Sequence, residues 1–159
     1  MTELLSIAPT LAAPVPDWET KRAEHERRDG ELRPVNKTAV FDALGAAGIT
    51  IVVVAFDGYG DSGQIENVEA KDGEDLVGLP SVEVEIASAV WDQAEPDRTA
   101  MTVHDAIERL VFEFLGVTHD GWENSDGAYG DFTFDVAERT ITLDYNERYM
   151  QSEYSQHVF

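Results

Sequence analysis

Two short segments gather glycine, carboxylate and aromatic residues, the types that build metal sites and recognition loops. Residues 57–66 read DGYGDSGQIE, and residues 119–132 read HDGWENSDGAYGDF. Hard cations such as Ca²⁺ bind several oxygen ligands that one short loop supplies. The first segment is therefore a candidate calcium loop, with the ligands Asp57, Asp61 and Glu66.

The EF-hand register fits neither segment. In a loop that starts at Asp57, Tyr59 stands at the third position and Val68 at the twelfth. In a loop that starts at Asp120, Trp122 takes the third position. An EF-hand needs oxygen ligands at positions 3 and 12. A metal site of another form stays open as the alternative.

Enzyme motifs with a defined spacing are absent from the sequence. The four histidines show neither the HxH nor the HExxH spacing that zinc sites commonly use. Ser62 is not set in a GxSxG turn, and the glycine spacing fits no phosphate-binding loop. The chain has no cysteine, which excludes thiolate sites. We therefore favour a non-enzymatic protein without a cofactor, and a hydrolytic or small-molecule site in the two segments is the alternative.

The same residue types also suit plain turns. Glycine adopts positive φ at no steric cost, and Asp and Ser side chains bond back to the backbone. Both segments are thus predicted to turn the chain first and to offer a recognition surface second. The residues expected to contact a partner are Tyr59, Asp61, Trp122 and Glu123.

The net charge of −21 is distributed unevenly. Eight acidic and 6 basic residues precede Ile49, whereas 24 acidic and 5 basic residues follow from Ile49 on. Such a body repels nucleic acid and anionic membranes and attracts basic proteins, more weakly as salt rises. We expect a basic protein surface as partner and no direct binding of nucleic acid or membrane. Solubility or a salt-adapted host is the alternative explanation of the charge.

No secretory signal or apolar span is evident, so a cytoplasmic protein is expected. The sequence does not determine the oligomeric state, and a dimer is one of the open alternatives. The chain divides into four predicted parts: a flexible leader at 1–16, a charged helical arm at 17–33, a single α+β domain at 34–150 and a tail at 151–159. The arm either docks on the protein itself or serves as an arm for a partner.

Within the domain, hydrophobic periodicity predicts helices at 34–47 and 102–116 and strands at 49–56, 64–70 and 81–87, followed by a hairpin at 131–146. The predicted fold is α+β, an antiparallel sheet of about four to five strands from two hairpins, with helices packed on one face. Thr102 and Asp105 resemble a capping box at the start of the second helix. Phe112 projects away from the apolar stripe of that helix, which is either covered on both sides or exposes this ring.

The outward positions of the strands are rich in carboxylates. Outward residues of one strand lie about 6.6 Å apart and neighbouring strands about 4.8 Å apart, a charge density that approaches that of a nucleic-acid backbone. A half-solvated sheet explains polar residues there but not their negative sign. These carboxylates are therefore expected to contact the partner: Glu83, Glu85, Asp131, Asp135 and Asp144.

The motifs FDGYGDSGQIE and DGWENSDGAYGDFTFDVAERTITLDYNER resemble a domain-of-unknown-function family of small acidic proteins from bacterial plasmids, phages and integrated elements. The resemblance covers about residues 36–148 and implies no catalytic residue. It implies a setting on mobile DNA, where acidic proteins counter host nucleases or bind basic partners. The predicted function is a non-enzymatic acidic interaction protein of a mobile element, for example a DNA mimic that inhibits a host defence complex.

Overall fold

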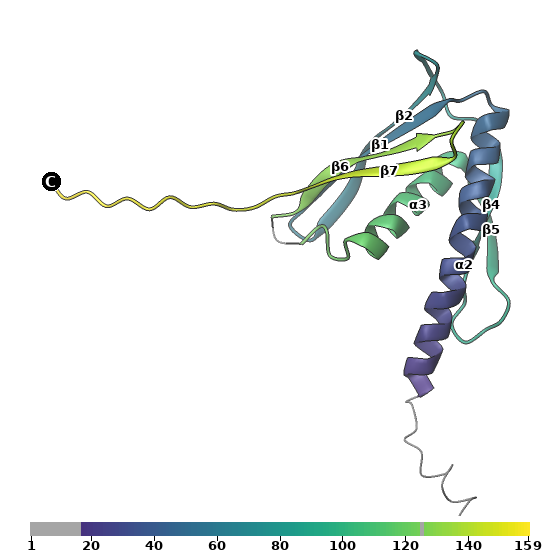
Figure 1. Cartoon of the computed structure of the whole chain (residues 1–159), viewed down its shortest axis with the longest axis horizontal. Coiled ribbons are helices and arrows are strands. Elements are labelled where there is room, and N and C mark those ends of the chain that lie inside the picture. Colours follow the sequence, from purple (N-terminus) through teal and green to yellow (C-terminus); the bar gives the residue numbers. More distant parts are fainter. Residues whose placement is uncertain (1–16, 125) are drawn as a thin grey trace, which may run out of the picture. The chain divides into compact units, whose positions relative to one another are not determined.

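The computed structural model describes residues 17–124 and 126–159, so the predicted leader lies outside the described residues. The α+β fold is confirmed (Figure 1). The elements, in chain order, are α2 (Asp17–Ala46), β1 (Ile51–Tyr59), β2 (Ser62–Asp72), β3 (Asp75–Val77), β4 (Glu83–Ser88), β5 (Asp97–Thr102), α3 (Val103–Thr118), β6 (Ala128–Asp135) and β7 (Thr140–Glu147). Among the described residues they fall into two compact units, one formed by residues 17–35 with 87–98 and the other by residues 36–86 with 99–159.

The second unit contains an antiparallel sheet of five strands in the order β3-β2-β1-β6-β7. The β-branched run of β1 places this strand in the centre, because such residues suit a pleated surface with neighbours on both sides. Alternate residues of β1 are buried, among them Val52, Val54 and Phe56. Both predicted hairpins are confirmed, β1 with β2 and β6 with β7.

One face of this sheet carries the core. Val52 and Val54 lie beside Phe134 and Phe132 of β6, and all four side chains are buried. Buried residues of α3 and of α2 after residue 36 belong to the same cluster, so the helical segments of this unit cover one face as predicted (Figure 1). Each large apolar side chain buried there contributes about 1.5–3 kcal/mol.

Helix α3 begins at the predicted cap. The Thr102 hydroxyl accepts a hydrogen bond from the Asp105 backbone N–H at 3.1 Å, which satisfies one of the free donors of the first turn. The stripe of the helix that includes Ile107 and Leu110 is fully buried. Phe112 is 42% exposed, so the helix exposes this ring and is not covered on both sides. None of the described helices has the length and apolar character needed to cross a membrane.

Helix α2 differs from the prediction, because a single helix runs where an arm and a second helix were expected. Pro34 lies inside it. A proline within a helix removes one hydrogen bond and costs roughly 3 kcal/mol. Tertiary packing offsets this cost after the proline, where Val40, Phe41 and Leu44 are buried in the core.

The predicted strand at 81–87 is also placed differently. It forms β4, which pairs with β5 in a separate two-stranded sheet. Glu83 and Glu85 therefore do not share a sheet with Asp131, Asp135 and Asp144, although the prediction placed the strands of all five residues in one antiparallel sheet. Strand β5, DRTAMT, lacks the alternation of apolar residues that predicts a strand.

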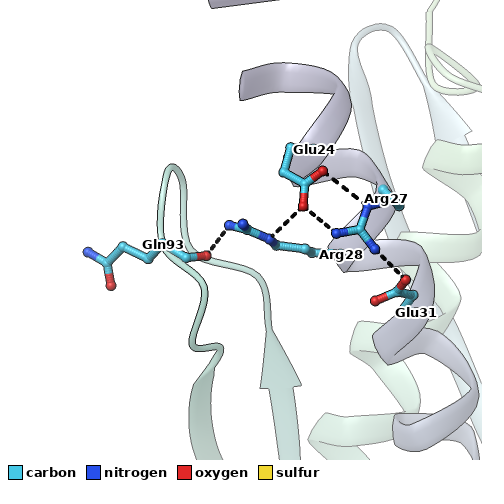
Figure 2. A network of polar contacts seen from close by, with 5 residues as sticks. All are labelled: Glu24, Arg27, Arg28, Glu31 and Gln93. Carbon is cyan, nitrogen blue, oxygen red and sulfur yellow. Dashed lines mark hydrogen bonds and ion pairs between the residues drawn. The ribbon is translucent and has the colours of Figure 1, made fainter. Parts of the chain in front are cut away.

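In the first unit, the charged first half of α2 contacts residues 91–93. The Lys21 ammonium lies 3.1 Å from the Asp92 carboxylate, and the His25 ring lies 5.6 Å from the Trp91 ring. Arg28 donates a hydrogen bond to the Gln93 carbonyl (Figure 2). The arm thus docks on residues 91–93 of its own chain.

Figure 2 also shows that Glu24 is the centre of an ion-pair network. Its carboxylate accepts hydrogen bonds from Arg27 and lies 3.2 Å from the Arg28 Nε, and Arg27 in turn bonds Glu31 at 2.6 Å. The hydrogen bond from Arg27, more than the charge of Arg28, lowers the pKa of Glu24 below its ordinary value.

Glu24→Gln is expected to lower the helical content of the arm at neutral pH, because it removes the negative charge and one of the two acceptor oxygens that Arg27 and Arg28 share. The lowered pKa of Glu24 stabilises the folded state above about pH 4.3, the ordinary value of glutamate, and this contribution disappears as the pH falls through the folded-state pKa. The helical contents of the native and variant chains should therefore become equal at acidic pH. Circular dichroism across the pH range measures this, with Glu19→Gln in the first turn as control. Equal losses in both variants would contradict the network.

Candidate functional site

The two glycine-rich loops meet at one end of the five-stranded sheet. Strand β1 pairs with β2 on one side and with β6 on the other, so the β1–β2 turn lies beside the segment that precedes β6. The Asp61 backbone N–H donates a hydrogen bond to the Glu123 carbonyl at 3.1 Å. The Arg148 backbone N–H closes the second loop with a bond of 2.9 Å to the Gly127 carbonyl. We call these two segments, 57–66 and 119–130, the joined loops.

Trp122 locks the joined loops together. Its side chain is only 8% exposed, and its ring meets the Phe56 ring edge-on with 5.4 Å between centroids. The indole lies against Gly58 and Gly63, where an added Cβ would come within 2.4 Å of ring atoms. These glycines therefore make room for the ring. Trp122 is expected to contact a partner from its sequence context, whereas the structure gives the ring a place in the interior.

Two further glycines permit close backbone approach. A Cβ on Gly127 would lie 1.9 Å from the Gly58 carbonyl oxygen, and a Cβ on Gly130 would lie 1.9 Å from the Asp144 carbonyl oxygen. Gly127 also has a φ of 81°, which L-residues rarely adopt. Most of the glycine pattern is thus required by packing between the strands and loops.

The carboxylates proposed for a metal do not gather. The Asp57 carboxylate accepts a hydrogen bond of 2.8 Å from Arg148, which also bonds the Gly58 carbonyl at 3.2 Å. That bond to Asp57 raises the pKa of the Arg148 guanidinium. Asp61 and Glu66 do not join Asp57 in any group of three ligand atoms within 4.8 Å among the described residues. Titration with Ca²⁺, Mg²⁺ and Mn²⁺ tests this alternative directly.

Another three possible ligand residues in the described part of the chain do lie together, with ligand atoms within 4.8 Å of one another. They are His104, Asp105 and Glu108 at the start of α3. The His104 Nδ1 lies 3.6 Å from the Asp105 carboxylate, and both side chains are exposed to solvent. Exposed side chains of this kind commonly cluster on a helix without an ion, so we assign no metal site to them.

A pocket beside the second loop is lined by His119 and Tyr145, whose rings stack with 3.6 Å between centroids. Burial, and to a lesser degree the charge of Glu147, raises the pKa of the Tyr145 hydroxyl, which therefore stays protonated. The Thr118 hydroxyl donates to the Phe114 carbonyl at 2.7 Å, so it accepts from the His119 Nδ1 at 3.0 Å. This pair orients the imidazole and does not activate a nucleophile.

The second face of the sheet, which points away from the core, is the open face. It carries the outward residues of the three adjacent strands β1, β6 and β7. Ala55, Asp131 and Asp144 form one row across these strands. The adjacent row on this face, two residues nearer to the joined loops, consists of Asp57, Tyr129 and Asn146. The full set is Ile51, Val53, Ala55, Asp57, Tyr59, Tyr129, Asp131, Thr133, Asp135, Thr140, Thr142, Asp144 and Asn146.

Sequence reasoning placed some of these residues correctly and missed others. Asp131, Asp135 and Asp144 lie outward on β6 and β7 as predicted. Tyr59 is 73% exposed at the end of β1. Tyr129, 44% exposed, was missed, although its alternation with Asp131 along β6 is a signal that indicates an outward ring.

Comparison with known proteins adds one finding to this geometry. Residues 32–159 match the model of a family of unknown function, DUF6878. The chain belongs to this family. The DUF6878 match begins within α2, includes the whole second unit with both joined loops, and continues beyond the end of the predicted resemblance to residue 159. Searches of curated proteins and of solved structures gave no match.

Proposed function

We propose that the chain is a non-enzymatic interaction protein that binds a basic surface of another protein through the open face. The observation that carries the proposal is the pairing of Asp131 with Asp144, two carboxylates directly opposite one another on neighbouring strands. Like charges in this position destabilise a sheet. Neither carboxylate has an ion-pair partner within the described residues. A cationic partner would relieve this repulsion on binding.

The composition of the open face supports a protein as the partner. Its central strand contributes Ile51, Val53 and Ala55, all half-buried, whereas Asp131 and Glu69 flank that strand on the two sides. An apolar centre with a charged rim is the usual anatomy of a protein interface. A surface that only imitates phosphates would need no apolar strip.

A nucleic-acid-binding protein is one partner with the required positive charge. The setting on plasmids, phages or integrated elements belongs to the same proposal, as does the role of a DNA mimic that inhibits a host defence complex. The exposed Asp144, the half-buried Asp131 and Asp135 and a net charge of −21 support electrostatic attraction of such a partner.

The double variant Asp131→Asn with Asp144→Asn is expected to be more stable and to bind less. Removing the like-charge pair should raise the free energy of unfolding by about 0.2–1 kcal/mol, measured by urea denaturation. Capture of a basic protein from a lysate of the source organism at low salt should weaken, because the same substitutions remove charge from the interface. High salt should release the protein captured by the native chain.

The matched control is Glu83→Gln with Asp97→Asn, which changes the net charge equally but lies on β4 and β5. It should leave both stability and capture near the native values. If the two double variants lose capture equally, bulk charge and not the open face attracts the partner. Capture that resists salt would also contradict the proposal.

A further inference from the structure

A notch on the far side of the joined loops combines aromatic and acidic side chains. Its lining comes from three elements that are distant in the sequence: the β1–β2 turn, α3 and the second loop. The lining residues are Asp61, Gly63, Phe112, Trp122 and Glu123. Trp122 packs on Gly58 of β1 and on its pairing partner Gly63 of β2. Gly58 alternates with the outward residues of β1, so the notch opens on the side of the core and not on the open face.

The aromatic wall of the notch is half exposed. The Phe112 ring lies 6.4 Å from the Trp122 ring at an angle of 33° and keeps 42% of its surface in contact with solvent. Leu110, Val111 and Leu115 of the same helix are buried, so the core does not need Phe112. An exposed ring beside a second aromatic residue is typical of interface anchors.

The acidic wall is held by the backbone. The hydrogen bond from the Asp61 N–H to the Glu123 carbonyl brings these two residues to the same edge of the notch. Neither side chain is engaged in an ion pair within residues 17–124 and 126–159. The notch therefore offers two free carboxylates beside a pair of aromatic rings.

We propose that this notch binds an arginine side chain of the basic partner, an inference that rests on the proposed function. A guanidinium group is planar and stacks on aromatic faces, and its several donors suit carboxylate acceptors. The lysine ammonium is compact and strongly hydrated and gains less from the Phe112 ring. The open face would then supply general attraction, and the notch would supply the preference for arginine.

Binding of nona-arginine and nona-lysine peptides, which carry equal charge, tests this proposal at near-physiological salt. The native chain should bind nona-arginine more tightly. Phe112→Leu should weaken nona-arginine binding roughly two- to fivefold and change nona-lysine binding little. Asp61→Asn should also weaken the binding of nona-arginine. Tyr154→Leu removes an exposed ring outside the notch and is the matched control, and thermal melting verifies that each variant is folded.

The outcomes separate the notch from the open face. Equal affinity for the two peptides, or a Phe112→Leu variant that retains its preference for arginine, would overturn the proposal. If the preference is absent while Asp131→Asn with Asp144→Asn still weakens both peptides, the notch proposal fails and the proposed function stands. If neither peptide binds, both proposals fail.

Discussion

Gly127→Ala is expected to destabilise the protein by about 3 kcal/mol or more. Its Cβ would lie 1.9 Å from the Gly58 carbonyl oxygen and 2.8 Å from the carbonyl carbon, both backbone atoms that no rotamer change can move. The φ of 81° adds strain of roughly 1–2 kcal/mol for any L-residue. Overpacking in a rigid region adds about 1–3 kcal/mol. Urea denaturation of the variant measures the sum.

Gly60→Ala is the matched control for this effect. Gly60 also has a positive φ, of 58°, but an added Cβ would meet no atom within 4 Å. Its variant should show the conformational strain alone, roughly 1 kcal/mol. The difference between the two variants therefore isolates the close contact of the joined loops. Similar losses in Gly127→Ala and Gly60→Ala would mean that the loops do not approach each other as described.

The second large effect is expected for the packing of Trp122 on Gly63. Trp122→Ala should cost about 3–5 kcal/mol, the range for removal of a buried aromatic side chain. Gly63→Ala should cost about 1–3 kcal/mol in the native chain, because its Cβ would lie 2.4 Å from the indole Cη2. The backbone of Gly63 does not have a positive φ, so alanine brings no conformational strain there.

A double-mutant cycle separates this contact from general destabilisation. In the Trp122→Ala background the ring is gone, so Gly63→Ala should cost little or even stabilise the strand. The expected coupling between the two positions is about 1–2 kcal/mol. Gly73→Ala, at a glycine whose added Cβ would meet nothing within 4 Å, should show no coupling with Trp122. Additive costs at positions 63 and 122 would contradict the packing.

Local sequence patterns were sufficient to predict several elements. The β-branched run IVVVAF identifies a buried strand, because such residues suit a pleated surface. The alternation in FTFDV identifies a strand with one apolar face, because side chains alternate between the two faces of a sheet. Thr102 and Asp105 identify the start of α3, since the cap hydrogen bond joins residues only three positions apart. Such signals depend on neighbours in the sequence.

The remaining features depend on contacts between distant residues. Nothing within residues 57–66 reveals that β6 pairs with β1, which brings the second loop to the same end of the sheet. The burial of Trp122 follows from that pairing. The continuous helix through Pro34 likewise reflects core packing of the later half of α2, which offsets a local cost. Four of the glycines that suggest a ligand-binding loop instead make room for the Trp122 indole or for the backbone of a neighbouring strand.

Mapping of amide chemical shifts tests the central claim, that the open face binds a basic partner, most directly. The nitrogen-15-labelled chain is titrated with nona-lysine peptide at near-physiological salt. We expect the largest chemical-shift changes in the row formed by Ala55, Asp131 and Asp144 and in the adjoining end of β1, and these changes should shrink as salt rises. Changes confined to β4, β5 and the first half of α2, or spread evenly over all acidic residues, would contradict the account.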